Sequence, residues 1–420
     1  MIRSMNPNLG ARGVGIEAMN NEQYKNYYES MMANLIASAQ DNIIDYYFTE
    51  RLNALNILFQ FMLIVFSMKD TEISKQFQNL YQEVKDKLIP NLWATYKSYF
   101  KPDFQIYKNI ESMEKKETHL IQVVLEQTLI LENLLVITRK QQKNFSKDVF
   151  VDMFNFFEKK KFMGFLYDNN SDFYIQNFKE SYSNITIKNI DIQVLILLNQ
   201  FGIDNPNIFK SDQQINTDNM PFSLFKNSSD VRDLLKIFKE SKNNSVISSL
   251  LMVFIETFLY LDNAIKIEKI TDSDIKNVIN DEKKEFEKLT DNFNEDHVIP
   301  GLEYLIFMFN KEIFKSDFKQ PIFSIYKQVL YDVINLMCQY IEIDQDNSYL
   351  KLIIRLCEKV FENDTSLLKA FSIKDSQSPL GNLFRTLINH CPASIEETIK
   401  LADILTEGNP IFSATVCLLT

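Results

Sequence analysis

The stretch Asp230-Val-Arg-Asp-Leu-Leu-Lys-Ile-Phe238 decides the fold class. Four of its apolar residues, Val231, Leu234, Leu235 and Phe238, share one face. They follow the i, i+3, i+4, i+7 spacing of an amphipathic helix, and the opposite face is polar. A turn-rich link over 241–245 leads into a far more apolar helix over 246–264. One half-exposed helix backed by one nearly buried helix is the unit of an α-solenoid.

Composition favours the same class. The chain has 420 residues, 45% of them hydrophobic, but only 8 glycines and 10 prolines, and three of the glycines precede Ile16. Sheet folds use glycine in tight turns and phosphate loops, so its scarcity favours helices joined by polar links. The sequence therefore predicts an all-α fold: an α-solenoid superhelix, right-handed, of HEAT/ARM-like helix pairs, with roughly seven to nine pairs.

Helical patterns extend in both directions from this hairpin. On the amino-terminal side helices are predicted over 17–39, 41–68, 72–100, 112–142, 147–163 and 187–201. On the carboxy-terminal side a helix of about five turns follows Pro321, which occupies a first helical position. Further helices are predicted over 350–361, from the N-cap Ser378 to before Pro392, and from the capping box of Ser394 and Glu397 to Gly408.

These elements suggest four regions. Residues 1–16 are expected to form a flexible tail, 17–204 the amino-terminal half of the solenoid, 205–221 a loop or insertion, and 222–420 the second half. The apolar end after Ile411 has no polar cap, so we expect the chain to be truncated there. Two membrane-like stretches, 54–68 and 249–261, are too short to span a bilayer and are expected to be helices buried in protein, without a transmembrane segment.

Charge and cysteine usage restrict the partners and the compartment. A formal charge of −11 disfavours direct nucleic-acid binding, which needs a basic face. Eleven acidic residues and six lysines lie within 262–296, a segment read as a solvated acidic face or as a dock for a basic partner. Unpaired cysteines and the absence of a secretory signal favour a reducing cytosolic or nuclear compartment. The cysteines are Cys338, Cys357, Cys391 and Cys417.

No catalytic, cofactor-binding or metal-binding residue is predicted. The three histidines, His119, His297 and His390, are isolated from one another, and His119 is expected at the surface. His390, beside Cys391, is expected to interact with the helix dipole at the carboxyl end of a helix. The glycines before Ile16 do not form a phosphate loop. Carboxylate pairs such as Asp281-Glu282 and Glu396-Glu397 are expected to be exposed. We expect that the protein is not an enzyme and has no small-molecule substrate. The alternative is an enzyme, or an enzyme's regulatory subunit, built on a helical array.

Several stretches resemble the amino-terminal region of the large inner-ring scaffold nucleoporins. The run Tyr46-Tyr-Phe-Thr-Glu-Arg51 before the apolar helix 52–66 is similar to an aromatic run and Glu-Arg pair that open a Leu-rich helix in that family. Residues 125–135 resemble the family's Glu-Gln-then-Leu-Leu-Glu helix, and 154–164 its next helix, which closes on Phe-Gly. A weaker similarity covers 380–392, whereas 205–294 departs from the family.

The resemblance implies a structural subunit of the nuclear pore inner ring that supports nucleocytoplasmic transport of protein and mRNA. Its location would be the nuclear envelope, and its partners other nucleoporins, whose helical linker segments would bind in grooves between its helices. No residue can be named as a partner contact. The alternative is a karyopherin-like or other HEAT-type adaptor, which would bind the small GTPase of nuclear transport in its GTP state.

Overall fold

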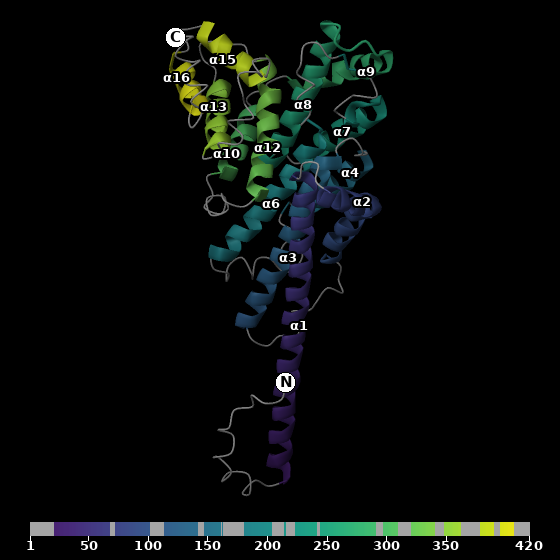
Figure 1. Cartoon of the computed structure of the whole chain (residues 1–420), viewed down its shortest axis with the longest axis vertical. Helices are drawn as coiled ribbons and strands as arrows, with labels where there is room; N and C mark the ends of the chain where they lie inside the picture. Colours follow the sequence, from purple (N-terminus) through teal and green to yellow (C-terminus); the bar gives the residue numbers. More distant parts are fainter. Residues whose placement is uncertain are drawn as a thin grey trace.

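The structure is a computed structural model (Figure 1). It describes residues 21–67, 72–100, 113–141, 147–160, 162, 180–203, 214–215, 223–241, 244–290, 297–309, 321–340, 348–362, 379–389 and 395–406. The α-helices are α1 (Asn21–Ser67), α2 (Glu72–Ser98), α3 (Met113–Gln141), α4 (Lys147–Lys159), α6 (Glu180–Gln200), α7 (Ser228–Glu240), α8 (Ser245–Lys266), α9 (Ser273–Thr290), α10 (Ile299–Phe309), α12 (Pro321–Met337), α13 (Ser348–Phe361), α15 (Pro379–Asn389) and α16 (Ile395–Thr406).

The predicted all-α class is confirmed for these residues. Two short 3-10 helices, η4 (Ser223–Phe225) and η6 (Cys338–Tyr340), accompany the α-helices, and no strand is formed in the described ranges. An isolated parallel bridge joins Ile215 to Ile270. The predicted tail over 1–16, and all of the expected loop over 205–221 except 214–215, lie outside the described residues.

The helices follow one another in space much as they do in the chain. Successive contacts run from α3 to α6, α8, α10, α13 and α16. In Figure 1 α2, α4, α7 and α9 lie to the right of this row, whereas α12 lies in the middle, between α8 and α13, and contacts both. Helix α12 departs from neighbour-only packing, because it contacts α3, α6 and α8 as well as α13 and α15.

Helix α1 corrects two predictions. A boundary was expected between 39 and 41, but α1 is one continuous helix of 47 residues, about 70 Å long. Neither glycine nor proline interrupts Ala39-Gln-Asp-Asn42, so nothing forces the backbone out of the helix there. The apolar stretch from residue 54 was expected to be buried on most sides, yet it buries only one face, with Phe59 and Met62 inside and Ile57 70% exposed.

The long apolar helices α3 and α8 lie mostly inside the protein, as was predicted for residues 249–261 of α8. Both are long and apolar enough to cross a membrane by length and composition, and most of each is buried within the protein itself. Phe254 of α8 is fully buried, and its ring lies 5.1 to 6.0 Å from those of Phe201, Phe225, Phe238 and Phe286. This aromatic cluster joins α8 to its neighbours on several sides.

Buried polar side chains connect α3 to helices distant in sequence. Glu132 of α3 accepts from Lys188 of α6 at 3.0 Å and from the hydroxyl of Tyr326 of α12 at 3.0 Å. One turn or more further on, Arg139 pairs with Asp332 of α12 at 2.8 Å. Because an unpaired buried charge is costly, these contacts hold α12 against α3 and α6.

Helices α8 and α10 approach closely at Gly301. A Cβ atom at this position would lie 3.0 Å from the Cα atom of Ser249 and 3.1 Å from the carbonyl oxygen of Ser248. Both neighbours are backbone atoms of α8 and cannot rotate away. Glycine at this position therefore permits the backbone contact between the two helices.

We expect Gly301→Ala to lower the free energy of unfolding by about 1–3 kcal/mol, because α10 must shift away from α8. The matched control is Gly381→Ala in α15, half-buried, where helix propensity predicts no loss or a gain of up to ~1 kcal/mol. Chemical denaturation measures both. Equal effects at the two positions would contradict the close packing at Gly301.

Candidate functional site

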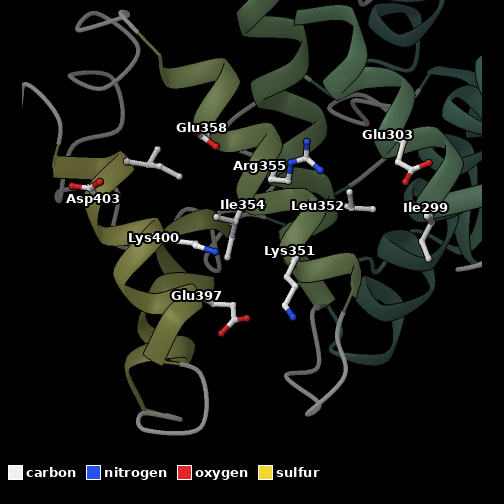
Figure 2. A pocket seen from close by; sticks show the side chains of 11 residues that line it. Ile299, Glu303, Lys351, Leu352, Ile354, Arg355, Glu358, Glu397, Lys400 and Asp403 are labelled. Atoms are coloured by element: carbon white, nitrogen blue, oxygen red, sulfur yellow. The ribbon is translucent and has the colours of Figure 1, made fainter. Parts of the chain in front are cut away.

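A groove runs along α13 in the described part of the protein and is here called the α13 groove (Figure 2). Its volume is about 810 Å³. Helix α10 lines one side and α16 the other, and α13 contacts both. The lining residues are Ile299, Glu303, Lys351, Leu352, Ile354, Arg355, Glu358, Glu397, Lys400, Asp403 and Ile404.

The local sequence explains why α13 presents this surface. Its buried stripe includes Leu350, Ile353 and Cys357 and anchors the helix to the core. Lys351, Arg355 and Glu358 follow at i, i+4 and i+7, so they share one neighbouring face. The same face lies between α10 and α16, as Figure 2 shows.

The α13 groove has an apolar floor and a charged rim. Its apolar lining residues are Ile299, Leu352, Ile354 and Ile404, and the remaining seven of the eleven carry charge. Three of the charged residues are cations and four are acids, so the rim is mixed. Within α16, Lys400 Nζ donates to Glu396 at 2.6 Å, which raises the pKa of Lys400.

This lining fits a helical peptide better than a small substrate. Small-molecule pockets are mostly apolar with a few converging polar groups. A helix that docks in a groove instead places apolar anchors on the floor and polar side chains against a charged rim. α16 also exposes Ile395 (51%) and Ile399 (61%), neither of which lines the α13 groove.

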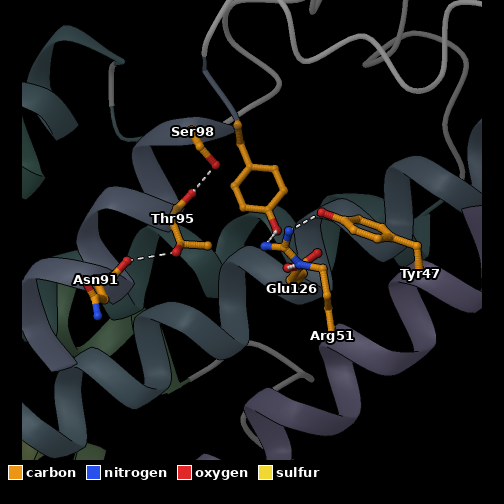
Figure 3. Close-up of polar contacts among 7 residues, drawn as sticks. Tyr47, Arg51, Asn91, Thr95, Ser98 and Glu126 are labelled. Atoms are coloured by element: carbon orange, nitrogen blue, oxygen red, sulfur yellow. Dashed lines mark hydrogen bonds and ion pairs between the residues drawn. The ribbon is translucent and has the colours of Figure 1, made fainter. Parts of the chain in front are cut away.

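The aromatic and Glu-Arg run that carries the family resemblance forms a structural network (Figure 3). Arg51 of α1 forms an ion pair with Glu126 of α3, which is fully buried, and also hydrogen-bonds to Tyr47. Its second terminal nitrogen donates to the hydroxyl of Tyr99 at 3.2 Å. Burial raises the pKa of Tyr99 strongly, and the nearby Glu126 carboxylate raises it further. These contacts join α1, α3 and the end of α2.

The expectation that His119 lies at the surface is wrong. His119 is 3% exposed, and its ring stacks on Phe48 of α1 with centroids 6.2 Å apart. Its Nδ1 atom lies 2.9 Å from the side-chain oxygen of Gln122. The charged start of α3 suggested exposure, but α1 covers this side of the helix. His297 is half-buried at the start of α10, and His390 lies outside the described residues.

The predicted exposure of the carboxylate pairs holds only in part. Glu396 is exposed, whereas Glu397 is half-buried and lines the α13 groove. Glu282 is 2% exposed and accepts a hydrogen bond from Arg232 of α7 at 2.6 Å. Charge alone suggested a solvated residue, but α9 turns this position toward α7.

The acidic segment is partly neutralised by its own lysines and by Lys239 of α7. Asp262 pairs with Lys266 at 2.7 Å and with Lys283 at 3.1 Å. Hydrogen bonds from Lys239 and Lys288 lower the pKa of the Glu285 carboxyl to about 2. The segment is therefore less available to a basic partner than its composition suggested.

Of the cysteines, Cys338 and Cys357 are buried and free, and the other two lie outside the described residues. Burial raises the pKa of both thiols strongly, so neither is a thiolate nucleophile near neutral pH. Glu256 of α8 is nearby: burial raises its pKa to about 8, and it adds to the raised pKa of Tyr349. Searched over the described residues, no group of three or more His, Cys, Asp or Glu side chains could hold a metal ion.

The lining of the α13 groove was not identified from the sequence. Its signal is present, because charged residues recur at i, i+3/i+4 and i+7 beside the apolar stripes of both α13 and α16. That pattern is also typical of an ordinary solvated face, and only the packing of α10, α13 and α16 distinguishes the two. Comparison of the chain with family models, with curated proteins and with solved structures found no match.

We expect Arg51→Ala to lower the free energy of unfolding by about 2–4 kcal/mol, because it leaves the buried Glu126 carboxylate without its cation. Adding Glu126→Gln to Arg51→Ala removes that buried charge and should recover most of the loss. Denaturation followed by the fluorescence of Trp93, the single tryptophan, measures the cycle. Purely additive losses in the double variant would contradict a direct pairing.

We expect Glu256→Gln to stabilise the protein increasingly as pH rises from about 5 to 8. The folded-state pKa of Glu256, about 8, exceeds the ordinary value of 4.5, so the unfolded state releases its proton first and wild-type stability falls across this range. The difference should reach on the order of 4 kcal/mol at pH 8 and vanish below pH 4. Glu240→Gln, at a 68% exposed side chain, is the control. A pH-independent difference for Glu256→Gln would rule out the buried neutral carboxyl.

Proposed function

We propose that the protein is a non-catalytic helical scaffold that binds amphipathic helical segments of other proteins in the α13 groove. The observation that carries this proposal is the combination of an apolar floor and a charged rim between three helices. A docked helix places residues at i, i+3/i+4 and i+7 toward such a floor. Leu352 and Ile354 are the anchor positions on the protein side.

The arrangement of the helices supports a solenoid-like scaffold. Contacts from α3 through α6, α8, α10 and α13 to α16 follow the chain order, as stacked helix pairs do. The additional contacts of α12 with α3 and α6 make the array more compact than one in which each unit contacts only its neighbours. A rigid array of this kind holds the α13 groove preformed, which reduces the entropy lost on binding.

For the biological setting we propose the inner ring of the nuclear pore, with linker nucleoporins as the partners. The support is that residues 46–51, 125–135 and 154–164 resemble segments of the scaffold nucleoporins. In this chain the first two of these segments meet through Arg51 and Glu126, so the similar residues have a structural role between α1 and α3. A role in the skeleton of the fold suits residues that a scaffold family would share.

We expect a Lys351→Glu, Arg355→Glu double variant to capture inner-ring linker nucleoporins from nuclear-envelope extract about tenfold less than the wild-type chain, a change of ~1.4 kcal/mol. Reversing two rim charges disturbs the groove without altering its floor. The matched control is Lys236→Glu with Lys284→Glu, two exposed lysines on α7 and α9. Quantitative mass spectrometry of the captured proteins is the measurement.

The outcomes separate the alternatives. Enrichment of cytosolic complexes without pore components would overturn the pore assignment. Equal capture by the groove variant and the wild type would overturn the α13 groove as the binding site. Binding of the small transport GTPase in its GTP state would instead favour a karyopherin-like adaptor.

A further inference from the structure

The amino-terminal half of α1 stands away from the rest of the protein. Figure 1 shows this part of the helix, drawn in purple, extending from the group of packed helices. Among the described side chains of α1, Phe48 is the first that is fully buried. Residues 21–47 are therefore an arm of about 40 Å, whose last turn contacts the rest of the protein through Ile44, partly buried on the core, and Asp45, 3.6 Å from His119. In proteins most of the stability of a helix comes from the packing of its amphipathic face and not from helix propensity. The arm therefore needs a partner to account for its apolar surface.

One face of the arm is apolar and exposed. Tyr28, Met32, Leu35, Ala39, Ile43 and Tyr46 follow one another at spacings of 4, 3, 4, 4 and 3 residues. From Tyr28 to Ala39 the pattern advances eleven residues in three turns, so these side chains form a nearly straight stripe. Asn26 and Ser30 lie on the opposite, polar face. Amphipathic helices with a straight stripe pack along their length.

The exposed apolar surface is large for an isolated protein. Leu35 is 52% exposed, Ile36 53%, and Ile43 and Tyr46 each 68%. With the neighbouring tyrosines and methionines, the arm exposes on the order of 1,000 Å² of apolar side chain, more than the largest patch of a typical monomer. One partner in a standard interface contributes about 800 Å². The arm alone therefore offers enough surface for a stable pair.

We propose that the arm packs antiparallel against the arm of a second copy of this chain, with Leu35 and Ile36 at the two-fold axis. In this register, residues whose numbers add up to 71 lie opposite one another. Tyr28 lies against the partner's Ile43, and Met32 against the partner's Ala39. Large side chains thus face smaller ones, as a self-complementary interface requires.

The acidic residues of the arm and the bulk of the packed helices both favour the antiparallel orientation. Glu29 then lies level with the partner's Asn42, and Asp45 lies level with the partner's Asn26. Neither of these two acidic residues therefore lies beside the same residue of the partner. A parallel pair would place Glu29 beside Glu29 and Asp45 beside Asp45, and would bring the two packed helical regions together at one end. In the antiparallel pair the helix start at Asn21 lies level with the partner's Glu50, next to where the partner's buried region begins.

The first test is the mass of the full chain in solution, measured by light scattering over a micromolar concentration range. The wild type is expected at twice the chain mass of 49.4 kDa. Leu35→Asp is expected at the chain mass, with dimer affinity reduced at least ~100-fold, because it places a charge at the two-fold axis. Ser30→Asp adds the same charge on the polar face and should remain dimeric.

Folding and orientation need their own readouts. Trp93 lies outside the arm. Its fluorescence, and the thermal unfolding of the protein that it reports, should be the same in the Leu35→Asp and Ser30→Asp variants. A Tyr28→Cys, Ile43→Cys double variant should form a disulfide-linked dimer under mild oxidation, beyond any formed by wild type. Tyr28→Cys alone should not, since two Tyr28 positions lie about 22 Å apart in the antiparallel pair.

Three results would overturn the proposal. A wild-type chain that remains monomeric throughout the concentration range removes the dimer. A Leu35→Asp variant that remains dimeric removes the arm as the interface. Cross-linking by Tyr28→Cys alone shows parallel helices and removes the two-fold register. None of these results depends on the α13 groove or on its occupant.

Discussion

The fold depends on the pairing of charges that α3 carries into the interior. Glu126, Glu132 and Arg139 lie in the mostly apolar part of this helix, Thr118–Arg139, and a buried charge without a partner costs several kcal/mol. Each finds its partner on a different helix or set of helices: Arg51 on α1, Lys188 and Tyr326 on α6 and α12, and Asp332 on α12. Hydrophobic contact alone would let these helices slide along α3. The charged pairs define one position for each.

Most helices could be predicted from the sequence, because their apolar residues recur at helical spacing and few glycines or prolines intervene. The predicted 72–100 and 112–142 correspond to α2 and α3, and Pro321 does begin α12. The continuity of α1 was not predictable from Asp41, which looks like a helix start whether or not the preceding helix has ended. The return of α12 to α3 was also hidden, since periodicity describes a helix face and not the partner of that face.

Much less of the candidate site could be predicted. The charged residues of the α13 groove, such as Lys351 and Arg355, have the same spacing as residues of a solvated helix surface, and their function depends on which helices flank them. His119 and Glu282 show the converse, because polar residues in charged surroundings became buried through contacts with α1 and α7. Sequence periodicity identifies buried apolar residues well, but the burial of a polar residue depends on a partner elsewhere in the chain.

The contact between α12 and α3 has a consequence for synthesis on the ribosome. Tyr326 reaches Glu132 across 194 positions of the chain, so α3 is translated long before the residues that complete its polar partners. A nascent chain that has not yet reached Pro321 carries Glu132 and Arg139 without Tyr326 and Asp332. Contacts so distant in sequence slow folding and prolong the exposure of unfinished apolar surfaces. The amino-terminal helices therefore remain without these partners until the last third of the protein has been synthesised.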